Sequence, residues 1–300
     1  ALPGCSRRGT LRRWSRNNTR GLHALVRGAS RHSCSGSDTV WLNLFARSLW
    51  PYVGQHIKSI LCDTVQPLVN SKLPSFLQGK VHFEDIKLGD IPPEFTNLVV
   101  LDNIANDRIE IRMALKLESN LVASVVAIGA EVRVANLSLC GELSLVFGPF
   151  MPRPPYFGGL EIYCNNPLDL DFELGGNLIP HGLKPALCSA IAEVIARFLV
   201  LPHRIAVDLN PNDHVDNTDL KYADPIGVLR LTVLRARGLV AGDVSLLGTK
   251  SSDPYVVVSL GATKWHTPSV ARTLDPDWGE SGAGVTVDLP VHSASQLVKF

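Results

Sequence analysis

The stretch RIEIRMALKLE, residues 108–118, alternates apolar and polar side chains along its length. The apolar residues are Ile109, Ile111, Met113, Leu115 and Leu117, and the charged residues occupy positions between them. A period of two is typical of a β-strand with one apolar face and one solvated face. The stretch therefore predicts a strand in a sheet that has one apolar and one solvated face. The function depends on what the apolar face contacts.

The same period continues on both sides of this stretch. Strand-length apolar or alternating runs occupy 81–86, 96–104, 121–127, 130–147, 159–164 and 167–174. We expect a bulge near Glu84 and Asp85. No helical spacing separates these runs, and strands that follow one another without crossover helices pair antiparallel. We therefore expect an antiparallel sheet from Lys80 to Leu174.

Two segments show helical spacing instead. The first begins after Ser37 or Asp38, both good N-cap residues, and its apolar residues recur every three or four positions as far as Leu68. Pro51 lies inside this segment, so we expect it to kink or divide the helix. The second helix covers about 183–199, and a strand follows it at LPHRIAVDL (201–209).

A polar, Asp-rich stretch at 210–225 predicts a linker between two domains. The unit before it, 38–209, combines the sheet with its helices. The unit after it, 226–300, contains short alternating runs between turns, which is typical of an all-β sandwich. We expect this second domain to be incomplete, because about 75 residues is short for such a sandwich.

Residues 1–37 differ from the rest of the chain. They contain eight arginines, no Asp or Glu, and no apolar periodicity, so we expect a disordered leader. A transit peptide, a basic arm on anionic lipid and a non-native leader all fit this composition. The net charge of the whole chain is only +1. That value argues against a nucleic-acid partner, since phosphate binding requires a basic excess.

Signals for catalysis, metal binding and membrane spanning are weak. We find no GxSxG elbow, no P-loop and no GxGxxG after a strand, and therefore expect no enzyme activity. The cysteines at 5, 34, 62, 140, 164 and 188 form no CxxC pair, so we expect reduced thiols rather than disulfides or a zinc site. No apolar run approaches the roughly 18 residues of a membrane helix, so we expect peripheral contact with membranes.

Several stretches resemble a known protein family. WLNLFARSLWPYV (41–53), DIKLGDIPPEF (85–95) and FLVLPHRIAVDL (198–209) resemble the SMP lipid-transfer domain of extended synaptotagmins, tricalbins and plant synaptotagmins in order and spacing. Three later stretches resemble the C2 domain that follows in those proteins. These are GVLRLTVLRARGL (227–239), SDPYVVVSL (252–260) and TLDPDWGE (273–280).

The resemblance implies an α+β fold: an SMP (tubular lipid-binding) half-barrel of antiparallel strands with flanking helices, followed by a partial all-β C2 sandwich. It implies a groove that binds a glycerophospholipid as cargo. It implies non-vesicular lipid transfer between apposed membranes at endoplasmic reticulum contact sites, on the cytosolic face. It also implies a homodimer through the SMP domain and C2 docking on anionic membrane phospholipids. A membrane tether or scaffold that transfers no lipid is the alternative.

The apolar side chains of the sheet are the lining candidates for such a groove. They are Ile109, Ile111, Met113, Leu115, Val132, Val134, Leu143, Leu145, Leu170 and Phe172. Alternate residues of a curled strand point inward, and these side chains have few polar atoms that would lose partners there. Ordinary packing between sheet and helix is the competing interpretation for each residue, and the resemblance favours lipid for the set.

Two acidic residues are candidate calcium ligands. Asp243 and Asp253 flank the loop DVSLLGTKSSD, where the C2 domains that this one resembles place such ligands. Calcium takes six to eight oxygen ligands, so two carboxylates form an incomplete site, and we expect further aspartates beyond Phe300. A turn role for Asp253 in SDPY is the alternative. We expect Asp275 in LDPDW to be a turn residue.

Overall fold

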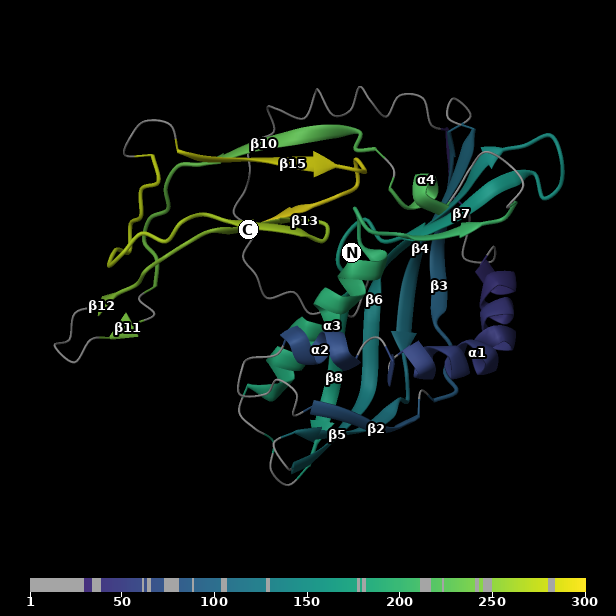
Figure 1. Ribbon diagram of the computed structural model, residues 1–300, viewed down its shortest axis with the longest axis horizontal. Helices are drawn as coiled ribbons and strands as arrows, with labels where there is room; N and C mark the ends of the chain where they lie inside the picture. The colour runs from purple at the N-terminus through teal and green to yellow at the C-terminus, as the bar shows by residue number, and fades with distance from the viewer. Residues whose placement is uncertain are drawn as a thin grey trace.

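The computed structural model describes residues 30–33, 39–60, 62–63, 66–72, 81–87, 89–103, 107–127, 130–176, 179, 182–210, 217–222, 224–240, 243–244, 250–279 and 284–300. These residues form two domains, a curved sheet with helices and a smaller all-β unit (Figure 1). The α+β class inferred from the sequence agrees with this architecture.

The first domain is built on one antiparallel sheet, as the alternating runs predicted. Its described strands are β1 (Ser30–Ser33), β2 (Val81–Lys87), β3 (Glu94–Asn103), β4 (Arg108–Glu118), β5 (Val122–Ala127), β6 (Ala130–Phe150), β7 (Phe157–Tyr163), β8 (Asp169–Gly175) and β9 (Ile205–Asp208). Along the sheet the order is β1-β3-β4-β6-β5-β2. Strand β6 is 21 residues long, and along its other edge it pairs with β8 and β7. Strand β9 pairs in turn with β7. The bulge expected in β2 is confirmed by a register shift between Glu84 and Lys87.

Helix α3 (Leu183–Leu199) covers the apolar face of this sheet and confirms the predicted helix at 183–199. Its buried residues, Leu183, Leu187, Ala190 and Val194, recur every three or four positions. They form one core cluster with residues of β5, β6 and β8, and α3 lies in front of β8 in Figure 1. The 3.6-residue period thus determines which stripe of α3 meets the sheet.

The predicted first helix divides at a different place from the one expected. Helix α1 (Val40–Ile60) runs through Pro51, and α2 (Gln66–Lys72) follows a break after Ile60. Pro51 lies on the exposed side of α1, where water can hydrogen-bond the carbonyl group that a proline leaves without a donor. Among the described residues no helix, α1 included, combines the length and hydropathy needed to cross a membrane.

Two segments expected to lack structure contain short elements. Residues 30–33 of the leader form β1, which pairs with the edge of β3; the other leader residues lie outside the described ranges. Backbone pairing needs no apolar pattern, so SRHS gave no signal. Within the linker 210–225, α4 (Asn217–Lys221) buries Leu220 against β7 at Gly159. A single anchoring leucine has no periodicity to detect.

The second domain is a partial sandwich of short antiparallel strands. Its described strands are β10 (Gly227–Val233), β11 (Asp243–Val244), β12 (Lys250–Ser251), β13 (Val257–Leu260), β14 (Thr263–His266), β15 (Val285–Val291) and β16 (Val298–Lys299). β10 pairs with β15, β11 pairs with β12, and β13 lies between β14 and β16. Val258, Leu260 and Leu289 form its core. β11 and β12 lie at the end farthest from the first domain (Figure 1).

Candidate functional site

The two faces of the sheet differ in character along most of β4 and β6. Directly opposite residues of antiparallel strands share a face, and the register pairs Ile109 with Phe147, Ile111 with Leu145, and Met113 with Leu143. We call this side the apolar face. The alternate residues, among them Arg112 and Ser144, lie on the polar face. The stretch 108–118 therefore has one apolar and one polar face, as its alternation predicted.

All ten lining candidates are in described strands, and three of them belong to the core under α3. Val132, Val134 and Phe172 are almost fully buried and pack in one cluster with the buried stripe of α3. This is packing between sheet and helix, the competing interpretation stated for each residue. These three side chains have little surface left to offer a ligand.

The other candidates lie further along β4, β6 and β8, and six of them are only partly buried. These six are Ile109, Ile111, Leu115, Leu143, Leu145 and Leu170, while Met113 is 2% exposed. Leu115 and Leu143 pack at the margin of the cluster around Cys164 and Val200. Partly exposed aliphatic side chains on neighbouring strands offer apolar surface that an apolar ligand can cover. Their role in lipid binding stays a prediction.

Aromatic side chains that the sequence analysis did not select lie at the end of this surface. The ring centroid of Phe157 is 5.3 Å from that of Phe147 and 5.8 Å from that of Phe150. Phe147 shares the apolar face with Ile109. The only sequence signal was the Gly-Pro-rich turn between Phe147 and Phe157, which indicates a hairpin tip but not aromatic contact.

The polar face carries an ion cluster that the sequence analysis also missed. Glu161 accepts hydrogen bonds from Arg108 at 2.6 Å and from Arg204 at 2.5 Å. Glu161 is 2% exposed and Arg204 is 7% exposed. The Arg204 guanidinium lies 5.3 Å from the ring centre of Tyr163, and burial raises the pKa of the Tyr163 hydroxyl. Arg and Glu are rarely buried unless paired, which is the case here.

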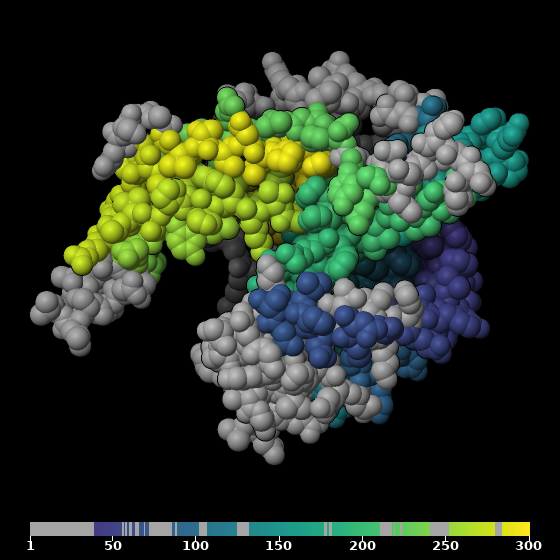
Figure 2. All heavy atoms as spheres, in the orientation of Figure 1, coloured from purple at the N-terminus to yellow at the C-terminus, as the bar shows by residue number. Residues whose placement is uncertain are grey.

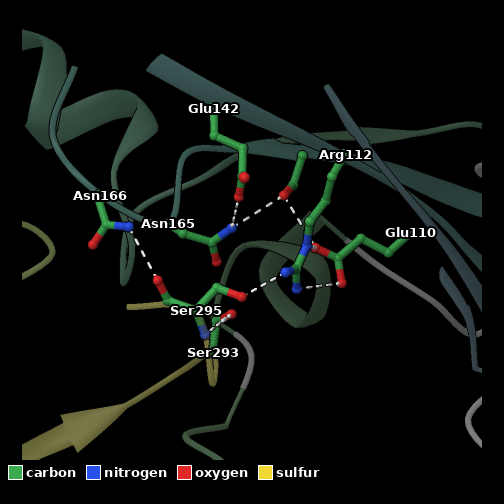
Figure 3. Close-up of polar contacts among 8 residues, drawn as sticks. Glu110, Arg112, Glu142, Asn165, Asn166, Ser293 and Ser295 are labelled. Atoms are coloured by element: carbon green, nitrogen blue, oxygen red, sulfur yellow. Dashed lines mark hydrogen bonds and ion pairs between the residues drawn. The ribbon is translucent and has the colours of Figure 1, made fainter. Parts of the chain in front are cut away.

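A second polar group includes Glu110, Arg112, Glu142 and Asn165 (Figure 3). Glu110 accepts hydrogen bonds from Arg112 and Ser144, while Asn165 donates to Glu142 and Ser144. Burial lowers the pKa of Arg112, but the hydrogen bond and charge of Glu110 outweigh burial and raise it. Charges satisfied by one another in this way suit a structural contact more than proton transfer.

Helix α1 is attached to the sheet by its less apolar side. The Asn43 amide exchanges two hydrogen bonds with the backbone of Phe95, and Trp50 Nε1 donates to the carbonyl oxygen of Gly89. The apolar residues of the opposite side are exposed: Trp41, Leu44, Phe45, Leu49, Tyr52 and Val53. We call these six residues the α1 stripe. The predicted periodicity is present, but it faces away from the domain.

The described part of the chain does not complete a calcium site. The Asp253 carboxylate accepts a hydrogen bond from the backbone N–H of Arg272, and Asp275 accepts one from Gly238. Both carboxylates therefore join segments that are far apart in the chain, and the turn role expected for Asp275 stays a prediction. Asp243 begins β11. No group of three or more His, Cys, Asp or Glu that could hold a metal occurs among the described residues. Two carboxylates fall short of the six to eight oxygens that calcium takes.

Family models match both domains. The model of the synaptotagmin-like mitochondrial-lipid-binding domain (SMP domain) matches residues 36–210, and the model of the C2 domain matches residues 227–295. The first match covers more than half of the chain. The order of the two matches is the order inferred from the sequence.

Curated relatives extend the similarity across the junction. Extended synaptotagmin-3 of Xenopus tropicalis is 30% identical over 264 residues, which cover 83% of this chain and 28% of the relative. Synaptotagmin-4 of Arabidopsis thaliana is 28% identical over 255 residues, or 80% of this chain and 43% of the relative. The chain thus spans between a quarter and a half of the length of these relatives.

A solved structure shows the same fold. The structure of extended synaptotagmin 2 that contains its SMP domain and two C2 domains superposes with a TM-score of 0.55 at 20% sequence identity. The match covers 84% of this chain and 52% of that one. The half-barrel followed by a partial sandwich, inferred from the sequence, is confirmed at the level of fold.

Proposed function

Because this chain belongs to the family of synaptotagmin-like mitochondrial-lipid-binding (SMP) domain proteins, we propose that its first domain binds a glycerophospholipid and transfers it between apposed membranes at endoplasmic reticulum contact sites. The observation that supports this proposal is the half-exposed apolar surface of β4, β6 and β8, which includes Ile109, Ile111 and Leu145.

Hydrocarbon contact is the physical requirement for such transfer. Burying one CH₂ group is worth about 0.8 kcal/mol, so two sixteen-carbon chains exposed to water cost on the order of 25 kcal/mol. Charged groups at the protein surface cannot offset that cost, whereas an apolar lining replaces the bilayer interior. The aliphatic side chains of the apolar face offer area without polar atoms that would be left unpaired.

The test combines lipid analysis with a blocked variant. Mass spectrometry of the purified chain is expected to find bound glycerophospholipid. The double variant I111W/L145W places two bulky rings on neighbouring strands at one level of the apolar face. It is expected to lose bound lipid and to transfer fluorescent lipid between liposomes at the background rate. The matched control is K116W/E118W, on the exposed polar side of the same strand.

The outcomes separate lipid transfer from the two rival functions. A chain that purifies without lipid and still brings liposomes together is a tether. Transfer that survives in I111W/L145W, with an unchanged circular dichroism spectrum, contradicts the lining assignment. Chemical turnover of labelled lipid would identify an enzyme instead.

We also propose that two SMP domains pair through the α1 stripe. Six large apolar side chains on one side of a helix form a contiguous exposed surface of the kind that marks interaction sites. A second copy offers the same stripe, and a two-fold contact requires only that a surface be complementary to itself. The pair would join two apolar faces into a longer path for lipid.

The C2 domain is proposed to dock the chain on an anionic membrane surface. The eight arginines of residues 1–37, without any acidic residue, would add attraction to such a surface, since a basic residue near an anionic leaflet contributes about 1 kcal/mol. Calcium ligation by Asp243 and Asp253 stays a prediction of the sequence, and the proposed docking does not depend on it.

A further inference from the structure

Part of the polar face of the SMP sheet is not in contact with water. Ser144 and Asn165 are fully buried, and Glu161, Tyr163 and Arg204 are each less than a tenth exposed. The polar face of a one-sided antiparallel sheet ordinarily faces solvent. Here that face carries its own buried cluster of Val146, Tyr163 and Leu201. Another part of the molecule therefore covers it, and Figure 2 shows the spheres of the C2 domain adjoining those of the SMP domain.

The loop 292–297 of the C2 domain provides one part of the cover. Arg112 donates a hydrogen bond from Nη1 to Ser295 Oγ. Asn166 donates from Nδ2 to the carbonyl oxygen of Ser295 at 3.0 Å, and Asn166 Oδ1 accepts from the backbone N–H of Leu297 at 2.7 Å. Figure 3 shows Ser295 between Arg112 and Asn166. The side-chain amide of Asn166 thus pairs with the backbone of the loop as a neighbouring strand would.

The turn between β13 and β14 makes a second contact with the SMP domain, at Leu201 and at the cluster around Cys164. The backbone N–H of Ala262 donates to the carbonyl oxygen of Leu201 at 2.9 Å, and Ala262 packs against the SMP cluster of Cys164, Leu168 and Val200. Gly261 has a φ of 58°, and a Cβ there would lie 2.2 Å from that same carbonyl oxygen. Only glycine permits an approach this close.

Hydrogen bonds of its own also fix the conformation of the loop 292–297. Gln296 Oε1 accepts from the backbone N–H groups of His292 and Ser293, and the N–H of Gln296 donates to the carbonyl oxygen of Ser293. These bonds lie within the C2 domain. A preformed loop loses little conformational freedom on docking, which favours a stable contact.

The charge of the covered face indicates what kind of surface it fits. The polar face carries Arg108, Arg112 and Arg204 together with Glu110, Glu161 and the exposed Glu142, so these formal charges cancel. An anionic lipid headgroup or an acidic peptide would find no uncompensated positive charge. The neutral loop of serines and backbone groups at 292–297 is complementary to such a face.

We infer that the polar face is a docking surface built for the C2 domain of the same chain, so that the SMP half-barrel and the C2 domain move as one rigid body. We call this contact the SMP–C2 joint. β11 and β12 lie at the end of the C2 domain away from the joint (Figure 1). A membrane bound at that end would meet the half-barrel at a fixed distance and angle. Only this use of the joint rests on the proposed function.

The joint is testable by the tumbling of the two domains in solution. Nitrogen-15 relaxation of the whole 300-residue chain is expected to give one rotational correlation time for SMP and C2 amides. The amides of Ala262 and Leu297 are expected to exchange slowly with deuterium. S295W inserts an indole between the loop and Arg112, and N166A removes the amide that holds the loop. Each is expected to shorten the C2 correlation time roughly twofold or more, because a free C2 unit is far smaller than the whole chain.

The matched control is A294W, because Ala294 is the exposed neighbour of Ser295 in the same loop. It is expected to tumble as the wild type does. N166A adds no bulk, so it tests the SMP–C2 joint even if S295W does not fold. Separate correlation times in the wild type, or no change in N166A, would overturn the inference. If the wild-type chain binds no lipid but its two domains share one correlation time, the proposed function is contradicted and the SMP–C2 joint is still supported.

Discussion

At the scale of single residues, the alternation in RIEIRMALKLE has two different meanings on its two sides. On the apolar side, Met113 is buried while Ile109 and Ile111 keep part of their surface exposed. On the polar side, Arg108 and Arg112 point to a face that is charged but largely covered. A charged residue in an alternating strand is expected to meet water, and here it meets a buried Glu161 or the C2 domain instead.

The buried pair of Arg204 and Glu161 leads to a stability prediction. E161Q keeps the shape of the side chain but leaves the buried guanidinium of Arg204 and the partly exposed one of Arg108 without their counter-charge. Removing one partner of a buried ion pair typically costs about 3–5 kcal/mol, so we expect the free energy of unfolding to fall by about that amount. Urea denaturation followed by circular dichroism measures it.

The matched control for E161Q is an exposed ion pair of the same kind. Arg230 and Asp288 form a two-bond pair on the surface of the C2 domain, and surface pairs contribute little because water and salt screen them. R230A is therefore expected to leave the unfolding midpoint nearly unchanged. Equal effects of the two variants would show that the Glu161 cluster is solvated.

Thiol chemistry gives a second prediction at this scale. Burial raises the pKa of Cys164 to about 12, so near neutral pH this residue stays a protonated thiol out of reach of reagents. Cys62 is exposed. Maleimide is expected to label Cys62 rapidly and Cys164 only after denaturation, as peptide mass spectrometry would show. Labelling of Cys164 in the native chain would contradict the buried cluster around it.

At the scale of elements, α1 and α3 share the same helical periodicity, but their apolar sides are in opposite environments. The apolar stripe of α3 meets the sheet and is buried, whereas the α1 stripe faces away and α1 is attached through Asn43 and Trp50. Periodicity identifies an apolar side in both helices. The position of each helix, at the face or at the edge of the sheet, decides what that side contacts.

The α1 stripe carries the prediction for this scale. L44D/F45D places two charges on the stripe and is expected to convert a dimer into a monomer in analytical ultracentrifugation. Both side chains are 57% exposed, so the melting temperature of the monomer should change little. R47D, on the same helix outside the stripe, is the control and should stay dimeric. A wild type that is monomeric at all concentrations would rule out pairing through α1.

At the scale of the whole molecule, the two domains are joined by more than their linker. The linker region contributes α4, which packs Leu220 on β7, and the joint adds contacts from Asn166 and Leu201 to two separate segments of the C2 domain. Contacts at several points resist rotation, whereas a single linker does not. The orientation of the half-barrel relative to a bound membrane would then depend on the C2 domain.

Calcium gives the prediction for the C2 end of the molecule. Among the described residues Asp243 and Asp253 are the candidate ligands, so we expect calorimetry on the whole chain to find calcium binding weaker than about 1 mM, the weak limit of natural sites. D253N should leave the heats unchanged. Tighter binding that D243N and D253N abolish would contradict this expectation.

Local patterns determined much of this protein by themselves: the antiparallel strands, the helix at 183–199, the order of the two domains and the family to which the chain belongs. They did so because alternation, helical spacing and turn residues act between near neighbours in the chain. The tertiary structure alone decided that Val132 and Phe172 fill a core under α3 while Ile111 stays partly exposed, that the α1 stripe faces outward, and that Glu161 and Arg204 pair in a buried site. A pattern shows that a strand or helix has two unlike faces, but contacts between residues far apart in the chain determine what covers each face.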